Sequence, residues 1–183
     1  MADAAAHLVR HPASHDEGAR AIRAALDYDA RGGLALHYRV DGTMAGLRWA
    51  VDREPGRADG LWQHGCFEVF LQGDGHAGYL EFNFAPCGSW AAYRFEGRRS
   101  GRESPAMPVP RIEFGSGPEH AELNVAIAPD ALAEFAGSTT IRAGLAAVLE
   151  DGRGRLSYWA LAHAAEAPDF HDPATFTIAL PAR

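Results

Sequence analysis

Side chains alternate between apolar and other types over three consecutive segments in the centre of the chain, and this pattern constrains the fold most. Apolar residues occupy every second position within each segment: Phe67, Val69 and Leu71; Leu80, Phe82 and Phe84; and Ala91, Tyr93 and Phe95. A period of two is that of a β-strand, whereas a helix repeats every 3.6 residues. The pattern therefore predicts strands at 65–72, 79–85 and 90–96, each with one face in a core.

Similar alternation, bounded by turn residues, predicts further strands along the chain. They are expected at 20–28 and 34–40 as a hairpin, and at 47–51, 111–114, 122–127, 140–150, 155–163 and 176–180. The Ala-rich segment 17–26 is also compatible with a helix, and residues 1–19 are expected to be a lead-in without a strand. Many short strands predict an all-β fold, an antiparallel β-sandwich.

Two segments between these strands differ from the rest. Residues 97–110 contain Gly, Ser, Arg and three Pro residues, so we expect a long loop there. Pro129 to Phe135 is a candidate short helix, because Pro is favoured in the first turn of a helix. The fold class predicted is therefore an all-β sandwich with one short helix.

Length and composition limit the classes of function. The 183 residues are enough for one domain, expected to span 1–183, and the net charge of −7 argues against nucleic acid or an anionic membrane as a partner. No basic segment followed by a long apolar run begins the chain, so a cytoplasmic protein is expected, with Cys66 and Cys87 as free thiols. An acidic protein suits a neutral or cationic small ligand.

Pairing the predicted core faces sets a register for the two central hairpins. With a loop centred between residues 75 and 76, Phe67 lies opposite Phe84. With a four-residue loop at 86–89, Phe84 lies opposite Ala91. The core side of the sheet is then apolar throughout, and the side chains of the other face follow without further choice.

That other face collects polar and aromatic side chains. The same registers place Glu68 opposite Asn83 and Glu81 opposite Arg94, with Cβ atoms about 5 Å apart. The simplest interpretation is a solvent-facing surface carrying a Glu81–Arg94 ion pair. Trp90 on the same face is poorly suited to water, which favours a face covered by a loop, a ligand or a partner chain.

Such a mixture of side chains is typical of a sugar site. Aromatic rings stack on the apolar faces of a pyranose, while carboxylates, amides and guanidinium groups form hydrogen bonds with its hydroxyl groups. A glycosidase pair formed by Glu68 and Glu81 is an alternative, but Arg94 beside Glu81 would keep that carboxylate ionised and unsuited to act as a general acid. No set of His, Cys or carboxylate residues has the spacing of a metal site.

Several stretches of the sequence resemble a known family. LWQHGCFEVFL at 61–71, YLEFNFAP at 79–86, GSWAAY at 88–93 and GRLSYWALAH at 154–163 are similar to bacterial DOMON-like domains. That family is similar in fold to the family-nine carbohydrate-binding modules. The resemblance covers most of the chain and implies a β-sandwich that binds either a sugar or haem.

The resemblance also implies roles for individual residues. Sugar-binding relatives hold the ligand between two Trp residues, with Glu and Arg binding hydroxyl groups; Trp62 and Glu68 match this pattern, and Arg94 and Trp159 are carried over with them. Haem-binding relatives use a Met together with a His or similar ligand. The three Met residues here lie outside the well-marked strands, which argues against haem.

We therefore predict a non-catalytic module that binds a carbohydrate or another polyhydroxylated molecule, without a metal or cofactor. The predicted ligand-binding residues are Trp62, Glu68, Asn83, Trp90, Arg94, Trp159 and His163. The alternatives are a haem-binding domain and a protein–protein interaction module, for example a homodimer that buries the aromatic face. Two questions stay open: whether loop 97–110 closes over the face, and whether Glu68 and Arg94 bind a ligand or only pair within the sheet.

Overall fold

A computed structural model describes residues 5–14, 18–51 and 54–183 of the chain. Its strands are β1 (Ala6–Arg10), β2 (Ala19–Tyr28), β3 (Leu34–Gly42), β4 (Gly56–Arg57), β5 (Cys66–Gly73), β6 (Tyr79–Phe84), β7 (Ser89–Phe95), β8 (Arg111–Ser116), β9 (His120–Ile127), β10 (Thr140–Glu150), β11 (Leu156–Ala160) and β12 (Ile178–Pro181). Four short 3₁₀ segments join them: η1 (Met44–Gly46), η2 (Leu61–Gln63), η3 (Pro129–Phe135) and η4 (Pro173–Thr175). The fold is all-β with little helix, as predicted.

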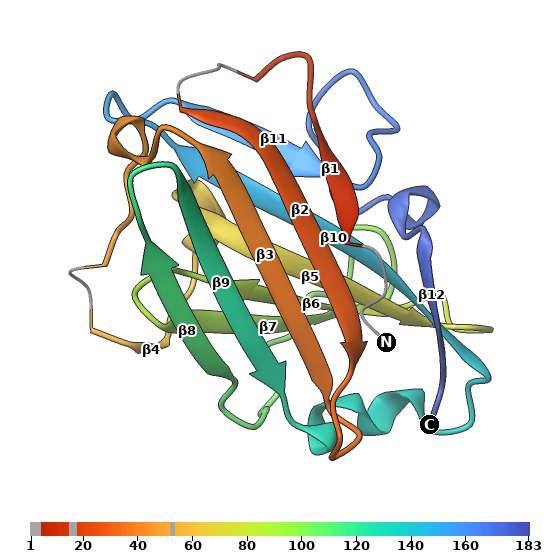
Figure 1. Ribbon diagram of the computed structural model, residues 1–183. Coiled ribbons are helices and arrows are strands. Elements are labelled where there is room, and N and C mark those ends of the chain that lie inside the picture. The colour runs from red at the N-terminus through yellow and green to blue at the C-terminus, as the bar shows by residue number, and fades with distance from the viewer. Residues whose placement is uncertain (1–4, 15–17, 52–53) are drawn as a thin grey trace.

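The strands form one curled sheet that folds back on itself into two layers. The hydrogen-bonded order is β4-β7-β6-β5-β10-β11-β1-β2-β3-β9-β8, with β12 paired to β10. Every pairing is antiparallel except the short parallel contact of β4 with β7. Strand β1 pairs with β11 on one side and β2 on the other, so it joins the two layers. Figure 1 shows the first layer, which contains β2, β3, β9 and β8, lying over β5, β6 and β7 of the second layer.

The main hydrophobic core fills the space between the two layers. Alternate residues of β3, such as Leu36, Tyr38 and Val40, point inward and pack against Phe67, Phe82 and other residues of the second layer. The hydroxyl of Tyr38 crosses the core and donates a hydrogen bond of 2.7 Å to the backbone carbonyl of Glu68. This bond satisfies the buried hydroxyl group and ties β3 to β5.

Most predicted elements are confirmed. The N-terminal hairpin is present, with strand rather than helix at 19–28, and η3 begins at Pro129 as the proline predicted. Two expectations were wrong. Residues 47–51 form only an isolated bridge from Leu47 to Asp151, and the lead-in contains strand β1. β1 escaped detection because Leu8 is its only buried residue, so no alternation marks it.

The register of the first central hairpin is confirmed, and that of the second is wrong by one residue. Phe67 pairs with Phe84 as predicted, but Phe84 pairs with Trp90 rather than Ala91. The loop has three residues, 86–88, because the amide of Ala85 donates to the carbonyl of Ser89 at 2.8 Å. Gly88 supplies the positive φ of +86° that ends such a three-residue turn.

The shift by one residue exchanges the two faces of β7. Trp90, Ala92 and Arg94 belong to the side that faces the first layer, whereas Ala91 and Tyr93 lie on the outer side together with Glu81. That outer face of the second layer is itself buried. It carries a second hydrophobic cluster, covered by η2 and by the segment that contains Phe170 and Phe176. Within the described ranges, no helix combines the length and apolar character needed to span a bilayer.

Candidate ligand-binding cavity

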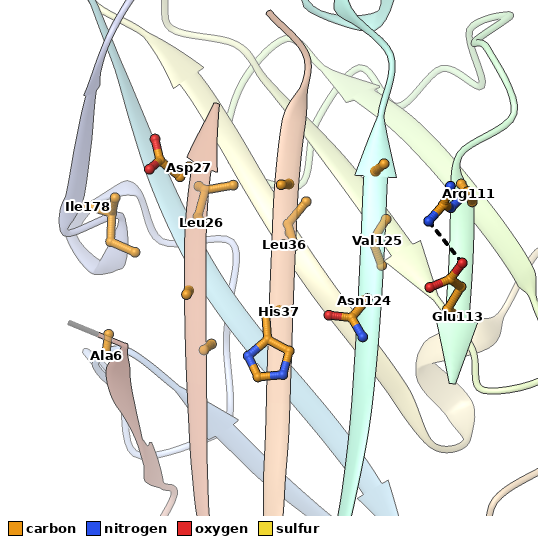
Figure 2. Close-up of a pocket in the computed structure, with 14 residues that line it drawn as sticks. Ala6, Leu26, Asp27, Leu36, His37, Arg111, Glu113, Asn124, Val125 and Ile178 are labelled. Atoms are coloured by element: carbon orange, nitrogen blue, oxygen red, sulfur yellow. Dashed lines mark ion pairs between the residues drawn. The ribbon is translucent and has the colours of Figure 1, made fainter. Parts of the chain in front are cut away.

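Of two hollows on the surface of the described residues, the larger lacks the features of a specific binding site. It lies on the outer face of the first layer, with a volume of about 510 Å³. Figure 2 shows its polar side chains His37, Asn124 and Glu113 on three neighbouring strands. Glu113 pairs with Arg111 at 2.9 Å, and both side chains are mostly exposed. Polar groups that are already solvated gain little from a ligand, so this hollow offers little selectivity.

The second hollow is a cavity of about 420 Å³ on the outer face of the second layer. Strands β5, β6, β7, β10 and β11 form its floor, and the segments after β7 and after β11 form its walls. It is lined by Trp62, Glu68, Glu81, Tyr93, Phe95, Arg99, Arg102, Val148, Tyr158, Pro168, Phe170 and His171. The volume falls in the range of small-molecule sites, about 300–1,000 Å³.

The registers of five adjacent strands explain why a hollow forms here. One row of paired residues runs across them in the order Ala91, Asn83, Glu68, Ala146 and Ala160. Three of these five side chains are single methyl groups, so they leave space above the sheet. The two polar side chains stand in the middle of that row, where the sheet is covered and water is largely excluded.

The polar groups on the floor are buried and incompletely hydrogen-bonded. Glu68 is 3% exposed, Glu81 4% and Asn83 0%. Asn83 Nδ2 donates to Glu81 Oε1 at 2.7 Å. Glu68 Oε1 and Asn83 Oδ1 have no hydrogen-bond partner among the described residues. Buried polar atoms without partners cost free energy, and a bound ligand that donates to them would recover it.

Burial also changes the protonation of the two carboxyl groups. Burial, and after it the neighbouring Glu81 carboxylate, raises the pKa of Glu68 well above its usual value. Burial raises the pKa of Glu81 to about 7, although the hydrogen bond from Asn83 opposes the rise. Two carboxyl groups on neighbouring strands in a covered site therefore resist becoming charged together.

The rim of the cavity is cationic and comes from the loop after β7. Arg98 Nη2 and Arg99 Nη2 bind the Asp169 carboxylate at 2.6 and 3.0 Å, which ties this loop to the segment after β11. Burial would raise the pKa of Asp169, but hydrogen bonds from Arg98 and from the backbone of His171 outweigh it and hold that pKa at about 2. Arg102 lies over the Tyr93 ring, 5.1 Å from its centroid. The first part of loop 97–110, around Arg98 to Arg102, therefore lies at the rim of the cavity.

His171 adds a neutral ring at the same rim. Its Nδ1 shares a hydrogen bond of 2.8 Å with the Tyr79 hydroxyl, and its Nε2 lies 3.8 Å from Glu81 Oε2. Burial, and after it the charge of Arg99, lowers the pKa of His171 to about 4. The imidazole is therefore uncharged at neutral pH and does not neutralise Glu81.

Aromatic side chains stand at both ends of the cavity. Trp62, from η2, meets Tyr93 edge to face with ring centroids 5.9 Å apart. Tyr158 and Phe170 lie over β11, four strands away from β7, with centroids 6.3 Å apart. The hydroxyl of Tyr93 donates to Asp59 Oδ1 at 2.7 Å, which fixes its ring. A flat ligand on the floor would have aromatic rings on either side.

The structure brings together three of the predicted site residues and separates two others from them. Trp62 and Glu68 line the cavity, and Asn83, which is fully buried and not a lining residue, pairs with Glu68 in the sheet beneath it. Trp90 does not reach the cavity, because the register shift buries it in the core between the layers, under the guanidinium group of Arg57. Arg94 lies on that same side and pairs with Glu134 at 2.6 Å. The predicted Glu81–Arg94 pair is therefore absent, and with it the reason for Glu81 to stay ionised.

The two C-terminal residues of the predicted site also lie elsewhere. Trp159 points into the core between the layers, where its indole N–H donates to Ser157 Oγ at 3.0 Å. The preceding residue, Tyr158, takes the place at the cavity wall. His163 is not a lining residue; its Nε2 hydrogen-bonds the carbonyl of Val9 at 2.8 Å and its ring packs against His11.

Sequence reasoning missed several lining residues. Tyr93 was assigned to the core face of its strand, and Trp159 was chosen in place of its neighbour Tyr158. Arg99 and Arg102 lie in the long loop 97–110, whose sequence gave no signal of where its side chains point. The three-residue turn ending at Gly88 is the signal that would have placed Tyr93 correctly.

Comparisons with known proteins support the fold. No protein-family model matches the chain, and no curated protein matches it. Among solved structures, a candidate carbohydrate-binding protein from Bacteroides uniformis has a TM-score of 0.69 at 19% identity, covering 94% of this chain and 82% of the other. A family-nine carbohydrate-binding module from Caldicellulosiruptor kristjanssonii, in complex with cellotriose, has a TM-score of 0.54 at 11% identity, covering 86% and 71%. At these identities the likeness shows a fold like that of a carbohydrate-binding module.

Proposed function

We propose that this protein is a non-catalytic module that binds a carbohydrate or another polyhydroxylated small molecule in the 420 Å³ cavity. One observation carries the proposal: buried acceptor atoms without partners lie on the floor of a cavity with aromatic rings at both ends. The similar fold of a carbohydrate-binding module supports it, since that module is described with cellotriose. The finer relationship to bacterial DOMON-like domains rests on the sequence resemblance and is part of the proposal.

The chemistry of a sugar matches this arrangement. Hydroxyl groups would donate to Glu68 Oε1 and Asn83 Oδ1, the two acceptors that lack partners among the described residues. The apolar faces of a pyranose would pack on Trp62 and on Tyr158. Since both acceptors are already desolvated in the empty cavity, a ligand that satisfies them pays little further desolvation cost there.

Hydrolysis is the alternative for these carboxyl groups, since a glycosidase uses one protonated and one ionised carboxyl group. The fold favours binding over hydrolysis, because it is like that of a carbohydrate-binding module. Haem fits less well, because the cavity lining contains no Met, and Met44 and Met107 pack at the core between the layers.

Isothermal titration calorimetry with a panel of monosaccharides and short oligosaccharides tests the proposal. We expect binding by the wild-type protein, and a loss of affinity of at least tenfold in Trp62→Ala, because truncating a Trp that anchors a ligand costs about 2 kcal/mol or more. Asn124→Ala, in the hollow of Figure 2, is the matched control and should bind like the wild type.

Two results would contradict the proposal. The site is wrong if Trp62→Ala binds as tightly as the wild type while Asn124→Ala does not. The non-catalytic role is wrong if the protein turns over nitrophenyl glycosides and Glu68→Gln abolishes that turnover.

A further inference from the structure

The polar atoms on the floor of the cavity are carboxyl and amide groups, whose oxygen atoms accept hydrogen bonds when the carboxyl groups are ionised. Asn83 Nδ2 is the donor there, and it is already bound to Glu81 Oε1 at 2.7 Å. Glu68 Oε1 and Asn83 Oδ1 have no partner among the described residues. Glu81 Oε2 lies 3.8 Å from the nearest His171 nitrogen, which is too far for a hydrogen bond. Two buried acceptor atoms of the described residues therefore lack partners on one small area of the sheet, and Glu81 Oε2 lies on the same face.

The nearest positive charges, Arg99 and Arg102, act on the floor from the rim of the cavity and form no ion pair with it. Arg99 is more than half exposed and its guanidinium group is held by the Asp169 carboxylate. Arg102 is exposed and stacked on Tyr93, and His171 is neutral because burial lowers its pKa. Among the described residues, no cation hydrogen-bonds or forms an ion pair within 4 Å with Glu68. Without a partner the buried carboxyl groups resist ionisation, and a cation delivered by a ligand would favour their ionised form.

We propose that the cavity selects sugars that carry a protonated primary amine, and that the ammonium group binds between Glu68 and Glu81. This inference rests on the proposed function and deepens it by naming the ligand class. An ammonium group has three donors and no acceptor, so it can donate to the two carboxyl groups and to a further acceptor of the floor. A hydroxyl group at the same position brings one donor and no charge. The chain's net charge of −7 also favours a cationic ligand.

An acidic sugar fits less well, although the rim carries Arg99 and Arg102. Those two side chains are exposed at the mouth of the cavity, where an ion pair contributes about 0–1 kcal/mol. Glu68 and Glu81, at 3% and 4% exposure, lie at its bottom. Charge-assisted hydrogen bonds are stronger in a desolvated site, so the buried carboxyl groups decide the selectivity.

Titration calorimetry with matched sugars tests the inference. Glucosamine, 3-amino-3-deoxyglucose and 6-amino-6-deoxyglucose are compared with glucose, N-acetylglucosamine and glucuronate, at a pH where the amines are protonated. We expect at least one amino sugar to bind at least tenfold more tightly than glucose. Repeating the titration in buffers of different ionisation enthalpy should show proton release with that amino sugar, because the ammonium group lowers the pKa of the floor carboxyl groups.

The variant Glu68→Gln separates charge from shape. It keeps the size of the side chain, and we expect it to bring the ratio of amino-sugar to glucose affinity close to one. Glu113→Gln, an exposed acid-to-amide change on the outer face of the first layer, should leave the ratio as in the wild type. Urea unfolding of each variant checks that it is folded.

The outcomes distinguish this inference from the function on which it rests. Equal binding of glucose and every amino sugar, with a loss in Trp62→Ala, would overturn the amine selectivity and keep the sugar site. Tighter binding of glucuronate would also overturn it. A ratio that is unchanged in Glu68→Gln would show that Glu68 does not recognise the amine. Failure of every sugar to bind would contradict the proposed function itself.

Discussion

At the scale of single residues, the buried carboxyl groups of Glu68 and Glu81 are the most unusual feature of the protein. Each lies on a strand of a sheet that is covered on both faces, and each is almost fully buried. Such groups remain in a fold at a cost unless something pairs with them. Their position on the floor of a cavity, with acceptor atoms unsatisfied, is the link between this fold and a ligand.

The Glu81 carboxyl group should make stability depend on pH. Its pKa is raised from 4.5 to about 7 by burial, so the folded protein holds a proton that the unfolded chain has lost over that interval. Its contribution to the free energy of unfolding is therefore present below about pH 4.5 and is lost as the pH rises through about 7. The groups that face it are Cys66, Glu68, Asn83, Tyr93, Arg99, Arg102 and His171.

Glu81→Gln removes this titration and should change the pH profile. The free energy of unfolding of the variant minus that of the wild type should increase by roughly 2 kcal/mol from about pH 5 to about pH 8. His171 opposes the trend, since its lowered pKa makes stability rise between about 4 and 6.5, but both proteins contain it. Urea unfolding at both pH values measures the difference, and parallel profiles would show that Glu81 is ionised throughout.

At the scale of elements, strand β7 shows how much of the fold and site the sequence predicts. The first hairpin was predicted in its correct register because only one face of β5 and β6 is apolar throughout. β7 is apolar on both faces, with Trp90 and Ala92 on one and Ala91 and Tyr93 on the other. Periodicity cannot choose between two apolar faces. Turn chemistry at Gly88 decides the register, and with it which aromatic residue reaches the cavity.

Changing Trp90 tests this register. Trp90→Ala should lower the free energy of unfolding by about 3–5 kcal/mol, because the ring is 3% exposed within the core between the layers. Sugar affinity should stay as in the wild type, since Trp90 does not line the cavity. Chemical denaturation and calorimetry on the same variant measure the two quantities. A loss of affinity without a loss of stability would instead support the register that places Trp90 on the outer face.

Changing Gly88 tests the turn itself. Gly88→Ala should cost roughly 1 kcal/mol of stability, because an L-residue is strained at a φ of +86° and the added Cβ would lie 3.1 Å from Pro55. Gly115 in β8 is the matched control, since its φ is not positive and a Cβ there meets nothing within 4 Å. Gly115→Ala should be neutral or slightly stabilising, and similar costs at both positions would contradict the three-residue turn.

At the scale of the whole molecule, the cavity depends on two segments that are distant in sequence. The loop after β7 and the segment after β11 meet where Arg98 and Arg99 bind Asp169. The sequence predicted the first of these as a long loop and left open whether it covers the face. It gave no means of pairing this loop with the second segment, because loop contacts have no periodic pattern. Tyr158, Phe170 and His171 could therefore be recognised as cavity residues only from the structure.

Breaking this link should loosen the cover and leave the sandwich intact. Asp169→Asn removes the charge that both arginines share, and the variant should show faster amide exchange in 97–110 and 166–172 than the wild type. Exchange in β5 and β10 should be unchanged, because those strands belong to the core of the second layer. Hydrogen–deuterium exchange mass spectrometry measures both, and equal protection of the two segments would show that the ion pairs do not hold them.

The indole N–H resonances of the four Trp residues test the central claim most directly, because they report on both faces of the second layer at once. Trp62 lines the cavity, whereas Trp49, Trp90 and Trp159 pack in or against the core between the layers. During a titration with the tightest-binding sugar, we predict that the Trp62 resonance shifts with ligand concentration and that the other three stay in place. Movement of Trp90 or Trp159 with Trp62 unchanged would contradict the cavity as the binding site.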